Sequence, residues 1–385
     1  MDTSKLYQER LARVTAAFNH QEPDSVPIIS QFETWAIGYS GKKILDVLND
    51  SEAEFQCFKK VYEDIYFDAA LMGFLTRDTR MYTPLGNSPY FYSEDGVCVQ
   101  HKECCYMSED EYDQLISDPM DYTVNVYYKK KYPSFNLDYP QSYEALKNSF
   151  GIFMKFIQKA SASSERYKNE LGIPLLPSGI GVMPADLIMD YYRGLKNTLA
   201  DVRRRPQKVA DAAEALFPVV LGDVTKGAGS LPPFPYCFFP MHIPTYLNPK
   251  QFEKIYYPTF SRMIKTLHGM GANIGMVMEG NWEHLYDFVN ELPHNAVLGF
   301  LDNEDIFKAK KEIGETVAIA GGHSGSMLKY NSAQENIDFA KKLVDEVSPG
   351  GGFMLTLSTM LLAKDEIDPE NLKAVNKFVH EYRRK

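Results

Sequence analysis

The chain has 385 residues, of which 44% are hydrophobic and 24% charged, and its formal net charge is −10. This length suits one large barrel or two ordinary domains. The acidic balance argues against a nucleic-acid partner, because phosphate binding requires a basic surface. No apolar run approaches the ~18 residues that a membrane span requires. The N-terminus has no apolar signal core, so we expect a cytoplasmic protein.

The first part of the chain predicts an N-terminal helix, two strands and an insertion. Gly and Pro residues punctuate 80–107, which indicates one or two inserted hairpins, and 108–172 reads as mainly helical. In chain order, the expected elements are a helix over 4–19, a strand at Val26–Phe32, helical segments over 43–63 and a strand at Phe67–Phe74.

From residue 175 onward, apolar strands and helical segments alternate regularly. Six strands here and the two earlier ones give eight βα units, which predict a (β/α)8 barrel. We expect a single domain over 1–385, with residues 80–172 inserted after the second strand. A doubly wound sheet is the alternative, but no GxGxxG motif follows the first strand. The six strands are Leu175–Gly181, Tyr236–His242, Asn273–Met278, Val297–Leu301, Val317–Ala320 and Phe353–Ser358, with helices near 183–224, 249–270, 282–291, 304–313, 333–347 and 369–382.

Glu279, Asp302 and His323 each close one of three successive apolar runs. Residues just past the strand ends of a parallel barrel meet at one rim. Two carboxylates and an imidazole there would suit one divalent metal ion with open positions. The alternative is structural, because the carboxylates could cap the next helices and a histidine between glycines could belong to an ordinary turn.

Other polar and aromatic residues near strand ends are candidates for the same site. His242 ends the fourth predicted strand and is our candidate for an acid or orienting group beside Glu279, with a surface loop histidine as the alternative. Trp35 and Trp282 could stack on an aromatic ring, although core packing is the default. Asn281 is a candidate substrate contact, and it or Asp287 could replace one of the three ligands.

Three segments of the chain resemble proteins of the uroporphyrinogen decarboxylase superfamily. They are Arg10–Ile28, Ala320–Leu328 (AGGHSGSML) and Pro349–Val375, and the ending PENLKAV is the most specific part. The similarity spans nearly the whole chain. It implies a (β/α)8 barrel that is either a cofactor-free decarboxylase of the haem pathway or a zinc methyltransferase that works with a corrinoid protein.

The decarboxylase branch of this superfamily fits the sequence poorly. Its members carry an Arg-rich motif after the first strand and a catalytic Asp late in the second. Here Ile29–Gly41 has no Arg, and Leu75 stands where the Asp would be. A polyanionic substrate would lack its guanidinium partners.

The methyltransferase branch fits in a modified form. Its thiol-dependent members bind zinc through an HxC pair and a later Cys, and the corresponding residues here are Val277, Glu279 and Thr359. The resemblance is strongest to ether-cleaving methyltransferases, which use carboxylates and a histidine. It implies zinc at Glu279, Asp302 and His323, and methyl transfer from an aryl methyl ether to a separate corrinoid protein, since this chain has no DxHxxG cobalamin signature.

Two other functions stay open at this stage. One is a metal-free lyase acting on a small carboxylic acid, with Glu279 and His242 as the proton-transfer pair. The other is a non-catalytic binding barrel. The methyl donor is also open, with phenyl ethers, methylamines and methylthiols all compatible with the sequence. Barrels of this kind often form homodimers, but the sequence carries no signal for one.

Overall fold

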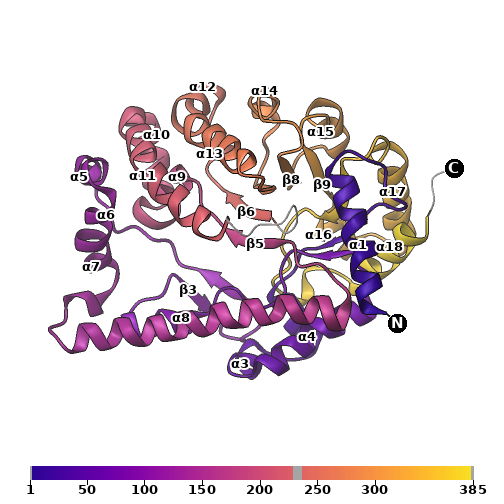
Figure 1. The fold of residues 1–385 in the computed structure, drawn as a ribbon, viewed down its shortest axis with the longest axis horizontal. Coiled ribbons are helices and arrows are strands. Elements are labelled where there is room, and N and C mark those ends of the chain that lie inside the picture. Colours follow the sequence, from indigo (N-terminus) through magenta and orange to yellow (C-terminus); the bar gives the residue numbers. More distant parts are fainter. Residues whose placement is uncertain (1, 229–235, 383–385) are drawn as a thin grey trace.

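A ring of parallel strands forms the centre of the computed structural model, which describes residues 2–228 and 236–382 (Figure 1). Six strands pair in the order β10-β9-β8-β7-β6-β5, and β1 pairs with β2. The bridges Ile28↔Leu355 and Ala70↔Leu175 join these two sheets and close the ring. The strands are β1 (Ile29–Ser30), β2 (Ala69–Ala70), β5 (Pro177–Ile180), β6 (Tyr236–Met241), β7 (Ile274–Met278), β8 (Val297–Leu301), β9 (Ala318–His323) and β10 (Phe353–Leu357).

Helices cover the outside of this ring, so the predicted (β/α)8 barrel is confirmed. The barrel helices are α2 (Thr34–Tyr39), α3 (Ile44–Val47), α4 (Ser51–Asp64), α9 (Pro184–Leu187), α10 (Leu195–Arg204), α11 (Pro206–Ala228), α12 (Pro249–Gln251), α13 (Tyr257–Gly269), α14 (Tyr286–Val289), α15 (Ile306–Glu312), α16 (Gly325–Tyr330), α17 (Ala333–Glu346) and α18 (Pro369–Glu381).

Two details differ from the sequence prediction. The first two strands are only two residues long each, because side chains replace part of the ladder: the Asp68 carboxylate accepts the Ile28 N–H at 2.9 Å. The helical segment expected near 183–224 consists of several helices, since Gly194 takes a φ of +78° and Pro206 begins a new helix.

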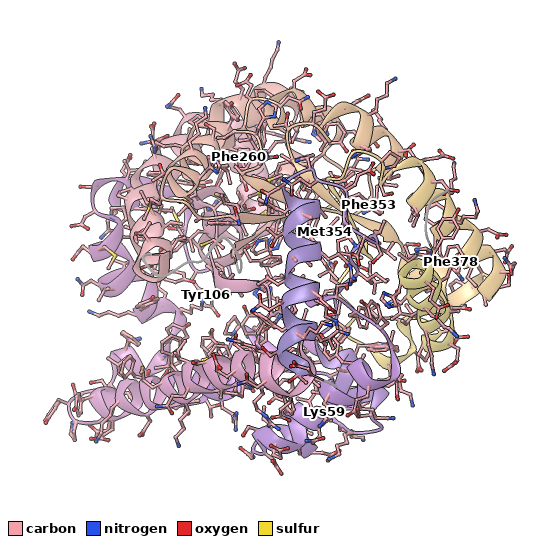
Figure 2. All side chains as sticks on the ribbon, turned by 45° about the vertical axis from the view of Figure 1, so that its right-hand side comes forward. Lys59, Tyr106, Phe260, Phe353, Met354 and Phe378 are labelled. Atoms are coloured by element: carbon pink, nitrogen blue, oxygen red, sulfur yellow. The ribbon has the colours of Figure 1, made fainter. Side chains whose placement is uncertain are left out.

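The inside of the barrel is filled by every second residue of the strands. Leu298 and Phe300 of β8 and Ala318 and Ala320 of β9 belong to one buried cluster inside the ring, as expected for alternating side chains. Helix α1 (Thr3–Phe18) closes one end, because its buried Val14, Ala17 and Phe18 join the same cluster. Figure 2 shows α1 crossing the molecule beside Met354, another member of this cluster. The opposite end of the barrel is not covered by α1 and can hold a functional site.

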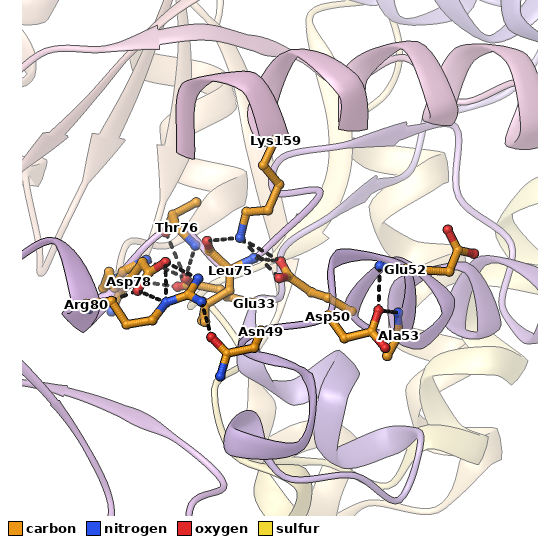
Figure 3. Close-up of polar contacts among 12 residues, drawn as sticks. Glu33, Asn49, Asp50, Glu52, Ala53, Leu75, Thr76, Asp78, Arg80 and Lys159 are labelled. Atoms are coloured by element: carbon orange, nitrogen blue, oxygen red, sulfur yellow. Dashed lines mark hydrogen bonds and ion pairs between the residues drawn. The ribbon is translucent and has the colours of Figure 1, made fainter. Parts of the chain in front are cut away.

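Residues 80–172, which the sequence analysis expects as an insertion, lie between β2 and β5. They contain the antiparallel hairpin β3 (Tyr90–Tyr92) and β4 (Val99–His101), followed by helices that include the long α8. Lys159 of α8 forms an ion pair with the buried Glu54 of α4 at 3.1 Å and donates to the Leu75 carbonyl (Figure 3). The helices of the insertion are α5 (Tyr112–Ser117), α6 (Pro119–Asp121), α7 (Tyr128–Lys131) and α8 (Gln141–Arg166).

None of the helices within the described ranges is long and apolar enough to cross a lipid bilayer. The five cysteines are all free thiols.

Candidate active site at the barrel mouth

Three polar side chains on adjacent strands point into the open end of the barrel. Val277 and Phe300 contribute to the buried cluster inside the ring. Counting two residues onward places Glu279 and Asp302 on the same inner face. On β6, two such steps lead from Phe238 to His242. The sequence therefore brings an imidazole and two carboxylates to neighbouring positions of one rim.

His242 lies between two carboxylates. Its Nδ1 is 2.8 Å from Oδ2 of Asp190, and its Nε2 is 3.2 Å from Oε1 of Glu279. Burial lowers the pKa of His242, but the hydrogen bonds to Asp190 and Glu279 outweigh it and raise the pKa to about 11. In the absence of a bound cation, His242 is therefore a protonated imidazolium between the carboxylates of Asp190 and Glu279.

A third carboxylate, which is fully buried, holds the backbone that carries His242. Oδ1 of Asp186 accepts the N–H groups of His242 and Ile243 at 2.9 and 2.8 Å, and Oδ2 accepts the Tyr256 hydroxyl at 2.6 Å. Burial and the nearby Asp190 raise the pKa of Asp186 to about 7. These bonds fix the end of β6, so that the imidazole keeps its place between its partners.

Asp302 is close enough to Glu279 for the two charges to interact. Burial raises the pKa of Asp302, and the negative charge of Glu279 raises it further, while the hydrogen bond from the Gly280 N–H lowers it. That hydrogen bond reaches Oδ2 of Asp302 at 2.9 Å. Two neighbouring carboxylates and an imidazole are a favourable surrounding for a cation.

A cavity of about 410 Å³ opens over these groups. Among the described residues that form its wall there is no Arg or Lys, so it offers no partner for a substrate with several carboxylates. Apolar and hydroxyl side chains make up the remainder of the wall. The lining residues are Met189, Asp190, Leu195, His242, Thr245, Tyr246, Glu279, Gly280 and Asp302.

The structure does not bring His323 to Glu279 and Asp302, as the sequence analysis expected. His323 is odd-numbered in β9, whereas the inward Ala318 and Ala320 are even-numbered, so its side chain lies on the outer face. There it is 2% exposed, with Nε2 3.0 Å from the Asn336 carbonyl and its ring against Phe339 of α17. Burial lowers the pKa of His323 to about 4.

The metal site with three protein ligands is therefore not assembled as we expected it. Within 2–228 and 236–382, no three side chains of His, Cys, Asp or Glu are grouped as metal ligands. The pair that the structure does bring together is His242 and Glu279, which the sequence analysis named as catalytic candidates.

The two tryptophans do not line the cavity either, which corrects their assignment as substrate contacts. Trp35 and Trp282 are 0% exposed, because burying these large rings in the core stabilises the fold more than a position at the rim would. Trp282 donates from Nε1 to the Glu279 carbonyl at 3.3 Å and so supports the rim from beneath. Asn281 contacts the Asn303 carbonyl at 3.4 Å, outside the cavity wall, and Asp287 is exposed on α14.

Sequence reasoning missed Asp186 and Asp190 altogether. Both lie in the segment near 183–224 that was expected to be helical, and their carboxylates reach the end of β6 across more than 50 residues of sequence. The position of this segment could have indicated these residues. It follows the third predicted barrel strand, and the segment after a barrel strand begins at the rim that holds the site. The insertion also approaches the site: burial lowers the pKa of His101 at the end of β4, and the charges of Asp190 and His242 act on it as well.

These features define a (β/α)8 barrel with an imidazole and carboxylates at its mouth. The family model for uroporphyrinogen decarboxylase (URO-D) matches residues 166–382, more than half of the chain, so the chain belongs to this family. A methyltransferase from Methanosarcina mazei has a similar structure, with a TM-score of 0.62 over 96% of this chain and 97% of that one. The two sequences are 12% identical, so this likeness shows the fold alone. No curated protein matches the chain in sequence.

Proposed function

We propose that this member of the uroporphyrinogen decarboxylase family is a methyltransferase, which moves a methyl group from a small methylated compound, an aryl methyl ether in our preferred form, to a separate corrinoid protein. The observation that carries the proposal is the Asp190–His242–Glu279 arrangement in a cavity without Arg or Lys. The methyltransferase that shares this fold is consistent with it. Such a cavity suits a small neutral substrate better than a polyanion.

Two features argue against the decarboxylation for which the family is named. The segment Ile29–Gly41 supplies no guanidinium group to the barrel. Leu75, at the position expected for the catalytic Asp, is 0% exposed and packs with Ile37, Ile44 and Val47 in an apolar cluster. These positions therefore provide neither cationic groups for a substrate with several carboxylates nor the catalytic Asp of the decarboxylases.

Two side chains at the mouth, His242 and Glu279, have the spacing of zinc ligands. A histidine that binds metal usually donates its other ring N–H to a carboxylate, and Asp190 accepts from Nδ1 of His242 in this way. The Nε2–Oε1 separation of 3.2 Å between His242 and Glu279 is near the roughly 3.3 Å between ligands of a tetrahedral zinc with bonds of about 2 Å. We therefore propose that His242, in place of His323, and Glu279 bind the ion, and that Asp302, which is not grouped with them as a third ligand in the described residues, would complete the set when the ion binds.

Zinc bound there would act as a Lewis acid on the ether oxygen, so that the phenolate can leave when the methyl group is taken. The residues of the chain would orient the imidazole of His242 and surround the substrate. Asp190 keeps the proton on Nδ1 of His242 and so leaves Nε2 as the available nitrogen. Met189, Leu195 and Tyr246 surround the substrate with apolar surface. The cavity opens at the barrel mouth, where the corrinoid protein would dock.

The first experiment is the metal content of the purified protein. We expect about one zinc per chain in the wild type and in His323→Ala, and none in His242→Ala or Glu279→Ala. Activity with an aryl methyl ether and a Co(I) corrinoid protein should follow the zinc content. A wild type that binds no zinc when it is supplied would overturn the mechanism and favour the metal-free lyase. Loss of zinc in His323→Ala and in Glu279→Ala, but not in His242→Ala, would restore the ligand set expected from sequence.

A further inference from the structure

Helix α8 carries an apolar stripe that faces away from the molecule. Its spacing alternates between three and four residues, which is the a/d pattern of a helix that packs against another helix. The side chains of the stripe are between 42% and 59% exposed. Most large apolar residues of the described chain are buried, so a regular exposed set on one helix needs an explanation. The stripe consists of Tyr143, Leu146, Phe150, Phe153 and Ile157.

The other face of α8 is already fixed to the rest of the chain. Ser149 donates to the Met81 carbonyl at 2.6 Å, Lys159 pairs with Glu54, and Ser163 is buried. Figure 3 shows Lys159 reaching down from α8 into this network. These contacts fix the orientation of α8 about its own axis. The helix therefore cannot turn the stripe toward the rest of its chain without breaking them.

The area of the stripe is close to what a dimer requires. With Met154 and with Tyr139, which is 81% exposed, it leaves roughly 700 Å² of largely apolar surface in water, near the ~800 Å² that each partner buries in a stable interface. A typical monomer has no larger patch than about 300–600 Å². The helix of 26 residues is about 39 Å long, which is enough for the whole stripe to meet one partner helix.

We propose that this stripe is an interface with a second copy of the chain, in which the two α8 helices pack antiparallel about Phe150. The positions are nearly symmetrical around that residue: Tyr143 and Ile157 lie seven residues to either side, and Leu146 and Met154 lie four. A two-fold axis at Phe150 therefore places Tyr143 opposite Ile157 and Leu146 opposite Met154, while Phe153 lies opposite the aliphatic stem of Lys147. Such a self-complementary patch is what a two-fold dimer needs.

Charge and shape favour the antiparallel direction. Glu144 lies six residues before Phe150 and Lys155 five residues after it, so antiparallel pairing brings Glu144 of one copy near Lys155 of the other. Parallel pairing would instead place Lys155 beside Lys155. The first half of α8 also extends beyond the barrel while its second half lies under it (Figure 1). Antiparallel packing therefore puts the two barrels at opposite ends of the helix pair.

Sedimentation equilibrium of the full chain from 1 to 100 µM tests the interface. We expect a wild-type dimer of twice 43.9 kDa, and at least a hundredfold weaker association in Phe150→Glu and Leu146→Lys. Tyr330→Glu is the matched control, because Tyr330 is an exposed aromatic residue on α16, and it should remain a dimer. Unchanged circular dichroism and melting temperature would show that the variants are folded. A monomeric wild type, or a dimer that survives Phe150→Glu, would overturn the proposal.

Disulfide trapping tests the direction of the helices. In a Cys105→Ser background, which removes the exposed native thiol, Phe150→Cys should form a covalent dimer under mild oxidation. Tyr143→Cys alone should not, but the double variant Tyr143→Cys/Ile157→Cys should. A covalent dimer of the Tyr143→Cys single variant would mean parallel helices and would overturn the antiparallel arrangement. Neither experiment depends on zinc or on methyl transfer.

Discussion

Asp190 decides which nitrogen of His242 is available at the barrel mouth. Its carboxylate accepts the Nδ1 proton at 2.8 Å, and an amide in its place can present an N–H to the ring and favour the other tautomer. We expect Asp190→Asn to weaken zinc binding about 10- to 100-fold, the usual effect of losing such a partner. Competition with a chromophoric chelator measures the dissociation constant.

The control for this prediction is another acidic residue of the same half of the chain. Asp211→Asn removes a carboxylate of α11 that accepts only from the exposed Gln207 among the hydrogen bonds described, and it should leave zinc affinity at the wild-type value. Equal affinity in Asp190→Asn and the wild type would mean that His242 is not a ligand or is held without Asp190.

His323 gives a pH dependence of stability with a defined sign. Its pKa is lowered by burial to about 4 in the folded protein, below the ~6.5 of an unfolded histidine. As the pH falls from about 6.5 to about 4, the unfolded chain binds a proton that the folded chain does not. Stability is therefore lost over this window, by roughly 3 kcal/mol at its lower end.

We expect His323→Gln to lose less stability than the wild type between pH 7 and pH 4.5. Urea unfolding at both pH values, with a chelator present, gives the difference. His294→Gln changes an exposed histidine and should behave as the wild type does. If His323→Gln and the wild type lose the same free energy, the imidazole is not buried against α17 as described.

The residues at the barrel mouth show which features of a site can be predicted from the sequence. Strand ends could be located, because charged residues interrupt apolar runs, and this found Glu279, Asp302 and His242. The direction of a side chain depends on whether its position in the strand is odd or even, and the end of an apolar run does not reveal this. On β9 the small Ala318 and Ala320 alternate with the larger Val317 and Ile319, but the inward Phe300 of β8 is large, so residue size alone does not show which face is inward.

At the scale of elements, the βα alternation predicted most strands within a few residues. It worked because buried parallel strands are short apolar runs between polar loops. It failed at 183–224, where a π-helical turn at Ile188–Arg193 and the break at Gly194 place Asp190 at the site. Such turns depend on tertiary contacts rather than on local propensity, so the carboxylates there could not be assigned a role from the sequence.

Helix α1 illustrates how one ion network attaches an element to the barrel. Arg13 pairs with Asp24 at 2.6 Å and with Asp68, whose side chain is 1% exposed. We expect Arg13→Leu to lower the free energy of unfolding by about 3–5 kcal/mol, because it leaves the Asp68 charge buried without its cation. Chemical denaturation measures this loss.

A lysine of the same helix provides the comparison. Lys5 pairs with Glu9 at 3.8 Å on the surface, with both side chains more than half exposed, and surface pairs contribute little. Lys5→Leu should therefore unfold at the wild-type denaturant concentration. A similarly small effect of Arg13→Leu would mean that water or another group takes over the charge of Asp68.

At the scale of the whole molecule, the proposed zinc ligands come from three adjacent strands, β6, β7 and β8, and the ion would tie these strands together at the open end of the barrel. The other end is already closed by α1. Binding to the folded state alone stabilises it by RT ln(1 + [L]/Kd), which is about 2.7 kcal/mol when free zinc is a hundred times Kd. We expect this gain in the wild type and in His323→Gln, but not in Glu279→Ala. Denaturation in buffers of fixed free zinc measures it, and an equal gain in Glu279→Ala would place the ion elsewhere in the molecule.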